Sequence, residues 1–318
     1  MQYFDHNQVT DGLDMAGCIP LMRDTLTDYS AGRVVQILRS VMAVTPRKLL
    51  GLMPAANTQT GIVGTKVITV FPDNFQRGLP SHQGVVMLFD LDTGALKAIL
   101  DGEGITAVRT AAASAAATDA LARPEAHVLC ILGSGLQARR HLEAMRLVRP
   151  IDQVRVWDIS RESVQRFKAE MEQVHGIPVL DCSDDVRKAV EGADIICTVT
   201  AAKEPILFGS HLTPGVHINA VGACGAAVRE LDSDAIKKGR LFCDSRESCM
   251  NEAGDLLIPL RAGEVEESHL LGEIGRVFTG ELAGRLSPED ITIFETQGIA
   301  AEDLAAANYI YEKGASKL

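Results

Sequence analysis

Between residues 127 and 245, short apolar runs alternate with longer segments of helical periodicity, and this alternation limits the possible folds more than any other feature. The apolar runs are HVLCIL (127–132), QVRVWDI (153–159), IPVLDC (177–182), DIICTVT (194–200), VHINAVG (216–222) and RLFCDS (240–245). Strands and helices that alternate along a chain are typical of a parallel sheet with helices on both faces. We therefore predict an α/β fold with a Rossmann-type, doubly wound sheet.

The first 120 residues follow a different pattern. The segment IVGTKVITVF (62–71) alternates, and GVVMLFDLDTGALKAILD (84–101) predicts two strands joined by a turn at Asp92-Thr93-Gly94. An antiparallel sheet after an N-terminal helix, an α+β arrangement, fits this part. A chain of 318 residues has room for two domains. We predict one over residues 1–118, completed by a C-terminal helix at 299–318, and a Rossmann domain over 119–298.

The stretch CILGSGLQARRHL (130–142) leads from a predicted strand through two glycines into a predicted helix. Gly133 permits the tight turn, Gly135 lets the backbone approach a pyrophosphate, and the following helix offers free amide N–H groups. Asp158 ends the next predicted strand, at the place where a carboxylate binds the ribose of NAD and repels a 2′-phosphate. Arg161 can partly reverse that preference. We predict a site for NAD(H) or NADP(H) here.

Four cationic or titratable side chains of the first half are candidates for chemistry: Arg39, Lys66, His82 and Arg109. Lys66 lies mid-strand, where a lysine either snorkels at an edge or serves a pocket. Arg39 fits a salt bridge as well as a bound carboxylate. Arg109 has only small sequence neighbours, which favours a ligand anion held by its guanidinium fork. His82, as a lone histidine, fits a structural or surface role equally well.

Composition excludes several classes of partner. The net charge of −11 and the pI near 5.2 argue against nucleic acid and anionic membranes. The chain contains no apolar run of membrane-spanning length and no signal-peptide pattern at its start, and its cysteines form no C-x-x-C pair. We expect a cytoplasmic protein with reduced thiols, a small-molecule substrate and no metal site.

A series of motifs along nearly the whole chain resembles the ornithine cyclodeaminase/mu-crystallin family. In order, they are GTKVITVFPDN, LPSHQGVVMLFD, ITAVRTAAASAAAT, CILGSGLQARRH, KEPILFG, GVHINAVGA, REL and TIFETQGIAAEDLAAA. Within the family, the chain looks most similar to ketimine reductases and pyrroline-2-carboxylate reductases. The resemblance implies a homodimer that pairs the antiparallel sheets of the first domains, which are the substrate-binding and dimerisation domains.

The resemblance also implies site roles. Arg39, Lys66 and Arg109 bind the substrate carboxylate and do the chemistry, with His82 nearby. The positions that it assigns to the cofactor are Thr110, Gly133, Gly135, Leu136, Gln137, Asp158, Arg161, Thr198, Val199 and Val221. Cys224 and Gly298 border the substrate. The cationic residues of the first domain are expected to face the nicotinamide across a shared cleft.

Two positions depart from the cyclodeaminase pattern. Cys224 stands where cyclodeaminases carry an aspartate, and a thiol cannot pair with a side-chain ammonium. Gln297 replaces an apolar residue. We therefore expect an oxidoreductase acting on C=N bonds, which reduces a cyclic ketimine carboxylate such as 1-pyrroline-2-carboxylate to L-proline. The alternatives are ornithine cyclodeamination, an alanine or N-alkyl amino-acid dehydrogenase, and a crystallin-like protein that binds NADP without turnover.

Overall fold

The computed structural model describes residues 1–315, with only the backbone at residues 75, 76 and 315, and the chain divides into two compact units. Unit 1 contains Met1–Thr110 together with the chain from Gly298 onward, and unit 2 contains Ala111–Gln297. The predicted boundaries after residues 118 and 298 lie eight residues and one residue further along the chain, and the first boundary falls inside one continuous helix, α3 (Gly102–Leu121), in either position.

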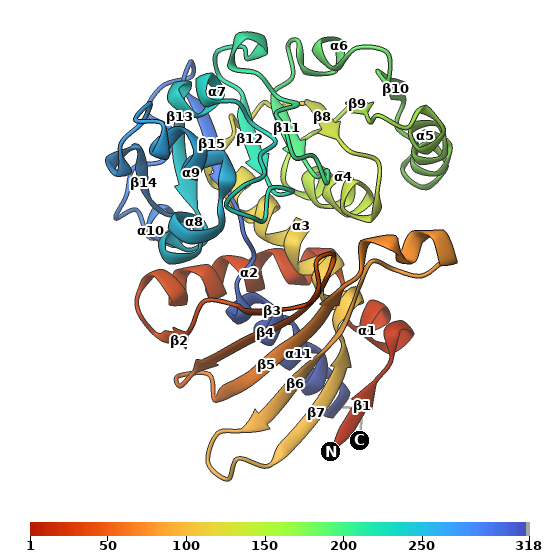
Figure 1. Ribbon diagram of the computed structural model, residues 1–318, viewed down its shortest axis with the longest axis vertical. Coiled ribbons are helices and arrows are strands. Elements are labelled where there is room, and N and C mark those ends of the chain that lie inside the picture. The colour runs from red at the N-terminus through yellow and green to blue at the C-terminus, as the bar shows by residue number, and fades with distance from the viewer. Residues whose placement is uncertain (316–318) are drawn as a thin grey trace. The chain divides into compact units, whose positions relative to one another are not determined.

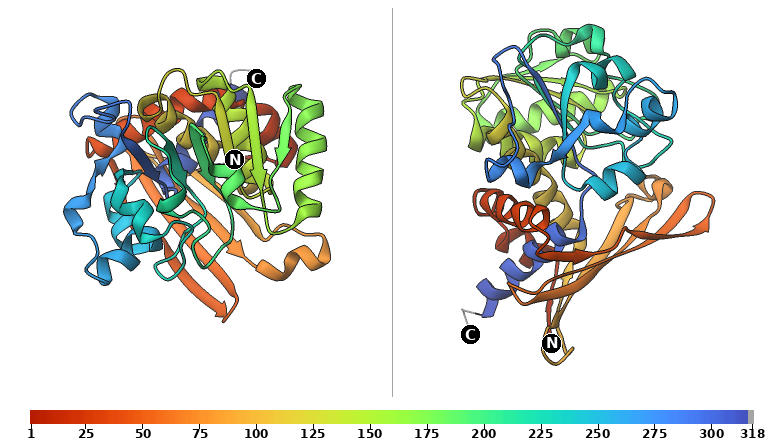
Figure 2. Two further views of the ribbon diagram at one scale, coloured as in Figure 1. Left: turned by 90° about the horizontal axis from the view of Figure 1, so that it is seen from above. Right: turned by 90° about the vertical axis from the view of Figure 1, so that its left-hand side faces the viewer.

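Unit 1 is built on a seven-stranded sheet with helices against one face (Figure 1, Figure 2). Its strands are β1 (Gln2–Phe4), β2 (Val34–Gln36), β3 (Ser40–Thr45), β4 (Lys48–Asn57), β5 (Ile62–Val70), β6 (His82–Asp90) and β7 (Leu96–Asp101). Its helices, besides the start of α3, are α1 (His6–Gly12), α2 (Met15–Ser30) and α11 (Ala300–Ala315). The predicted helix at 299–318 is thus α11, and residues 316–318 lie outside the described residues.

The predicted antiparallel sheet is confirmed for its central strands, with one correction. β4, β5, β6 and β7 pair antiparallel in sequence order, and the predicted turn joins β6 to β7, with Gly94 at φ +71°. β1, however, pairs parallel with β7, so the sheet is mixed. Four strands of this sheet, β1, β2, β3 and β4, have no counterpart among the predicted segments. β3 lacks the alternation that reveals a half-buried strand, because all six of its residues are exposed.

Unit 2 contains an eight-stranded sheet whose paired strands are all parallel, in the order β10-β9-β8-β11-β12-β15-β13-β14. Its strands are β8 (Val128–Leu132), β9 (Gln153–Trp157), β10 (Val179–Asp181), β11 (Ile195–Thr198), β12 (His217–Ala220), β13 (Gly239–Cys243), β14 (Leu270–Glu273) and β15 (Ile291–Glu295). The predicted doubly wound sheet is confirmed, and β14 and β15 add two strands that the sequence analysis does not predict. The chain order reverses between β8 and β11, which is where nucleotides bind in such sheets.

Helices cover both faces of the unit 2 sheet (Figure 2). They are α4 (Leu136–Val148), α5 (Arg161–His175), α6 (Val186–Val190), α7 (Ser233–Lys238), α8 (Arg246–Glu252), α9 (Gly254–Arg261), α10 (Ile274–Phe278) and the later part of α3. Ser160 is the N-cap of α5, since its side chain accepts a hydrogen bond from the Ser163 N–H. Val164, Phe167 and Met171 follow helical spacing and form the buried face of α5.

Candidate active site

Lys66 lies in the middle of β5, on the face of the sheet that α11 covers. Its side chain is almost completely buried, with a relative exposure of 2% for the residue. α11 packs closely here because Gly64 has no side chain. A Cβ at Gly64 would lie 3.0 Å from Leu304 Cδ2 and 2.1 Å from the Met87 carbonyl oxygen. The close approach of α11 places its carboxylates next to Lys66.

Asp303 of α11 joins the two buried cations of unit 1. Lys66 Nζ donates to both oxygens of Asp303, at 3.1 and 3.2 Å, and Arg109 Nε donates to Asp303 Oδ1 at 2.9 Å. Arg109 also donates from its NH1 to Glu302 Oε2 at 2.7 Å. All four side chains are buried. The cluster therefore satisfies the rule that buried charges are paired.

The cluster shifts the titration of its members. Burial is the largest cause that lowers the pKa of the Lys66 ammonium to about 8, with Arg109 and Arg39 adding to the effect and Asp303 opposing it. Burial alone would raise the pKa of Asp303, but Arg109 and Lys66 outweigh it, so that this pKa lies below its usual value. Lys66 is thus an acid that can hold or release a proton near neutral pH.

Arg39 and Gly298 lie beside this cluster within unit 1. Arg39 NH2 donates to the Gly298 carbonyl oxygen at 3.0 Å. Gly298 has φ +72°, and a Cβ on it would lie 2.5 Å from Arg109 NH1, so only glycine fits there. His82 is exposed at the start of β6. Partial desolvation, followed by the charge of Lys66, lowers the pKa of its imidazole. Arg39 and Gly298 therefore lie next to Arg109, whereas His82 is linked to the cluster through the charge of Lys66.

Two sequence interpretations are wrong for these cations. Lys66 does not snorkel to an edge, because its ammonium is buried against Asp303. Arg109 does not lack pairing partners, because α11 supplies two carboxylates that lie 193 and 194 positions along the chain. The sequence analysis missed Glu302 and Asp303. The available signal was the pair of adjacent acids in the small-residue segment AAEDLAAA, where a buried charge requires a cationic partner.

The glycine-rich turn of unit 2 connects β8 to α4. Gly133 has φ +115°, and a Cβ on it would lie 2.7 Å from the Val199 carbonyl oxygen, so the turn passes directly against the end of β11. Gly135 is exposed, and a Cβ built on it meets no atom of the described chain within 4 Å. Open space next to the start of α4 is what a pyrophosphate needs to approach the N–H groups there. Leu136 and Gln137 form the first turn of that helix.

Asp158 follows β9 and contacts the same turn. Its Oδ2 accepts hydrogen bonds from Ser134 N at 2.9 Å and from Ser134 Oγ at 2.8 Å, and its Oδ1 accepts one from Ser160 N at 2.9 Å. Asp158, Ser134 and Gly135 line one pocket together with Arg166. Arg161 is exposed at the start of α5. The sequence analysis missed Ser134, which fixes the Asp158 carboxylate relative to the turn.

The remaining predicted residues of unit 2 lie at or after the carboxyl ends of β11 and β12. The Val221 N–H donates to the Thr198 carbonyl oxygen at 3.1 Å, which joins these two strand ends. Cys224 is exposed, and its thiol donates to the Val221 carbonyl oxygen at 3.5 Å and to that of Gln297 at 3.8 Å. Thr110, the last residue of the first segment of unit 1, is buried in α3.

A model of the ornithine cyclodeaminase/mu-crystallin family matches residues 4–317. The chain belongs to this family. It is 40% identical to the ketimine reductase mu-crystallin of Rattus norvegicus over 94% of this chain and 92% of that protein. The structure of Thermococcus litoralis Δ1-pyrroline-2-carboxylate reductase in complex with NADH and L-proline is 34% identical, covers 100% of this chain and 98% of its own, and superposes with a TM-score of 0.97. An archaeal alanine dehydrogenase dimer with bound NAD is 28% identical, covers 99% of this chain and 96% of its own, and has a TM-score of 0.93.

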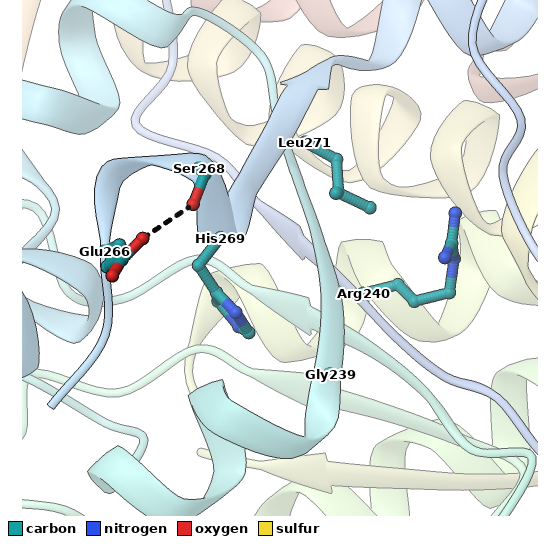
Figure 3. Close-up of a pocket in the computed structure, with 6 residues that line it drawn as sticks. All are labelled: Gly239, Arg240, Glu266, Ser268, His269 and Leu271. Carbon is teal, nitrogen blue, oxygen red and sulfur yellow. Dashed lines mark hydrogen bonds between the residues drawn. The ribbon is translucent and has the colours of Figure 1, made fainter.

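A further pocket of this family member lies on unit 2, lined by side chains around β13 and the start of β14 (Figure 3). None of the predicted site residues lines it. Its polar groups stabilise the fold, since Arg240 donates to the Gly284 carbonyl oxygen and the His269 ring contacts the Ile236 carbonyl oxygen.

Within residues 1–315, no cluster of three or more His, Cys, Asp or Glu side chains could hold a metal ion. No helix of that part of the chain is long and apolar enough to cross a membrane.

Proposed function

We propose that this chain reduces a cyclic ketimine carboxylate, such as 1-pyrroline-2-carboxylate, to the corresponding cyclic L-amino acid, such as L-proline, with NADH or NADPH as reductant. The observation that carries the proposal is the buried cluster of unit 1. Lys66, Arg109 and Arg39 contribute three positive formal charges, whereas Glu302 and Asp303 contribute two negative ones. A substrate carboxylate is the complement of this excess positive charge.

The proposed roles follow from these positions. The reduced nicotinamide supplies the hydride that adds to the imine carbon. Arg39 and Arg109 bind the substrate carboxylate, and Asp303 and Glu302 hold the Arg109 fork in one orientation. The Lys66 ammonium supplies the proton to the C=N nitrogen, because its lowered pKa of about 8 allows proton transfer near neutral pH. His82, Cys224 and Gly298 border the substrate.

The proposed cofactor site is the glycine-rich turn with its surroundings in unit 2. Gly133, Gly135, Leu136 and Gln137 receive the pyrophosphate, and Asp158 accepts the ribose hydroxyls. Arg161 lies near the adenosine, while Thr110, Thr198, Val199 and Val221 surround the nicotinamide. Support comes from the open space at Gly135 and from two similar structures, of which one contains NADH and the other NAD. The parallel sheet adds support, because its strand order reverses at the end of β8.

The experiment is a substrate panel followed by the absorbance of the reduced nicotinamide. We expect oxidation of NADH or NADPH with 1-pyrroline-2-carboxylate or piperideine-2-carboxylate, and the absence of turnover with both would overturn the assignment. Pyruvate with ammonium or methylamine tests the amino-acid dehydrogenase alternative. Ornithine without added reductant tests cyclodeamination. Arg109→Lys keeps the positive charge but loses the guanidinium fork that can bind a carboxylate through two hydrogen bonds. We therefore expect kcat/KM to fall, by a factor that corresponds to a loss of about 2–4 kcal/mol of transition-state stabilisation.

We propose that the chain works as a homodimer in the cytoplasm, paired through the sheet of unit 1. β3 and the chain before it expose a group of apolar side chains: Val35, Ile37, Val41, Met42 and Val44, each more than half exposed. Apolar surface of this kind is typical of a protein interface. Sedimentation of the wild-type chain should give a dimer, and Val41→Asp should give a monomer. A wild-type monomer would contradict the pairing.

A further inference from the structure

Glu230 is a buried carboxylate of unit 2 to which the proposed chemistry assigns no role. It belongs to the REL segment at 229–231, and its relative exposure is 0%. Its two side-chain oxygens accept hydrogen bonds from two different loops, one loop for each oxygen. Oε1 accepts from Thr200 N at 2.7 Å and from Thr200 Oγ1 at 2.6 Å, and Oε2 accepts from Gly222 N at 2.8 Å. One carboxylate therefore joins the chain after β11 to the chain after β12.

The two loops are packed so closely at Gly222 that no side chain fits between them. A Cβ at Gly222 would lie 2.6 Å from Glu230 Oε1 and 2.3 Å from the Thr200 carbonyl oxygen. The backbone of Glu230 is fixed as well. Its N–H donates to Asp255 Oδ1 at 2.8 Å, and its carbonyl oxygen accepts from Ile206 N at 2.8 Å. Hydrogen bonds thus fix the backbone of Glu230, and its carboxylate in turn fixes the two loops.

The two loops lie on a defined part of the cofactor site. Asp158, at the end of β9, is the proposed partner of the adenosine ribose, and the glycine-rich turn follows β8. Across the sheet the order is β9, β8, β11 and β12. A dinucleotide that extends from β9 over β8 reaches the ends of β11 and β12 with its other half. Thr200 and Gly222 follow those two strands and therefore lie at the nicotinamide half.

We propose that Glu230 is a positioning residue that holds the loops after β11 and β12 in place for the nicotinamide half of the cofactor, without touching the cofactor itself. The inference rests on the proposed function, since it requires a nicotinamide dinucleotide at this edge of the sheet. This role differs from that of a merely structural carboxylate. Such a carboxylate would stabilise unit 2 as a whole and would not affect the binding of the nicotinamide half more than that of the adenosine half.

The test compares two ligands that share one half. NADH and ADP-ribose both carry the adenosine and the pyrophosphate, but only NADH carries the nicotinamide. Glu230→Gln replaces one acceptor oxygen by an NH2 group that faces an N–H donor. We expect the Kd of NADH to rise about tenfold, as for the loss of one hydrogen bond to a charged group. The Kd of ADP-ribose, measured by calorimetry under the same conditions, should stay within about twofold.

Asp194→Asn is the matched control. Asp194 Oδ2 accepts the backbone N–H groups of His127 and Val128, both at 3.0 Å, at the amino end of the same sheet. This variant should lower the Tm and leave both Kd values unchanged. If Glu230→Gln does not fold, Thr200→Val is the second variant. It removes the bond from Thr200 Oγ1 to Glu230 together with the one that Oγ1 accepts from Ala202 N, keeps the bond from Thr200 N, and should weaken NADH binding selectively by a smaller factor.

The outcomes separate the inference from the proposed function. Equal changes in the two Kd values of Glu230→Gln, or a selective loss of NADH in Asp194→Asn, would overturn the role of Glu230. Unchanged values for both ligands in a folded Glu230→Gln would overturn it too. A wild-type chain that binds neither NADH nor ADP-ribose would instead overturn the proposed function, and the inference with it.

Discussion

Lys66 and Asp303 form a buried ion pair between β5 and α11, with Nζ 3.1 Å from Oδ1 and side-chain exposures of 3% and 0%. Asp303 also accepts from Arg109, which is paired with Glu302 as well, so one carboxylate contacts both buried cations. A charge without its partner is far more costly inside a protein than at its surface. The stability of unit 1 and the titration of Lys66 should therefore depend on the same carboxylate.

The first prediction concerns stability. Asp303→Asn removes the compensating charge but keeps the size of the side chain, so we expect the free energy of unfolding to fall by about 3–5 kcal/mol. Urea denaturation measures this change from the transition midpoint. The control is Glu264→Gln, which breaks an exposed pair with Lys237 at 2.8 Å and should cost less than about 1 kcal/mol. Equal effects of the two substitutions would contradict the prediction.

The second prediction is a pH dependence with opposite signs for activity and stability. Folding lowers the pKa of Lys66 from 10.5 to about 8. Between these values the unfolded chain binds more protons than the folded one, so the contribution of Lys66 to stability rises with pH in that range. Activity that needs the ammonium falls as the pH rises through about 8. A profile of kcat against pH shows this limb.

Lys66→Arg provides the control for that profile. An arginine keeps the positive charge but neither titrates nor gives up its proton in this range, so the activity should be lower and the activity that remains should show no descending limb near pH 8. The protonation of the imine substrate affects both enzymes equally and remains in both profiles. A limb that stays at the same pH in Lys66→Arg would assign it to the substrate or to another group.

The Rossmann half of the fold could be predicted because its strands are buried on both faces. All residues of β8, β11 and β12 are buried, β8 is apolar throughout, and helical segments separate the apolar runs that contain these strands. The edge of the unit 1 sheet gave no such signal. β3 exposes all of its residues, and a strand without a buried face carries no alternation in its sequence.

The site could be predicted only in part, for a related reason. Sequence spacing and the family resemblance singled out Lys66, Arg39 and Arg109 as candidates, because cations in apolar or small-residue surroundings need an explanation. Their partners could not be found by local reasoning. Asp303 lies 237 positions from Lys66. Only the packing of α11 on β5 brings the two together, and no periodicity within either segment specifies that contact.

The third prediction contrasts two glycines of one turn. Gly135 has φ −82°, which any residue can adopt, and a Cβ there meets open space. Gly135→Ala should therefore fold normally and raise the Kd of NADH about tenfold or more, because the methyl group occupies the path of the pyrophosphate. Gly133→Ala should instead lose at least about 1–3 kcal/mol of stability, since its φ of +115° is strained for alanine.

Calorimetric binding and thermal unfolding of both variants check the contrast. We expect Gly135→Ala to have normal stability and weak NADH binding, and Gly133→Ala to have reduced stability. If Gly135→Ala binds NADH as tightly as the wild type, the space next to Gly135 does not receive the pyrophosphate.

The fourth prediction concerns the choice between NADH and NADPH. The Asp158 carboxylate is held by Ser134 and Ser160 at the end of β9, where it accepts ribose hydroxyls and repels a 2′-phosphate. Asp158→Asn removes the negative charge, so the ratio of kcat/KM for NADH to that for NADPH should fall about tenfold. Asp181→Asn is the matched control, because Asp181 ends the next strand, β10, and accepts comparable hydrogen bonds from Ser183 N and Oγ, at 2.9 and 2.6 Å. Asp181 does not line the pocket of Asp158, although its charge acts on Arg161, so its substitution should change the ratio much less. A ratio that responds equally to both substitutions would place the ribose elsewhere.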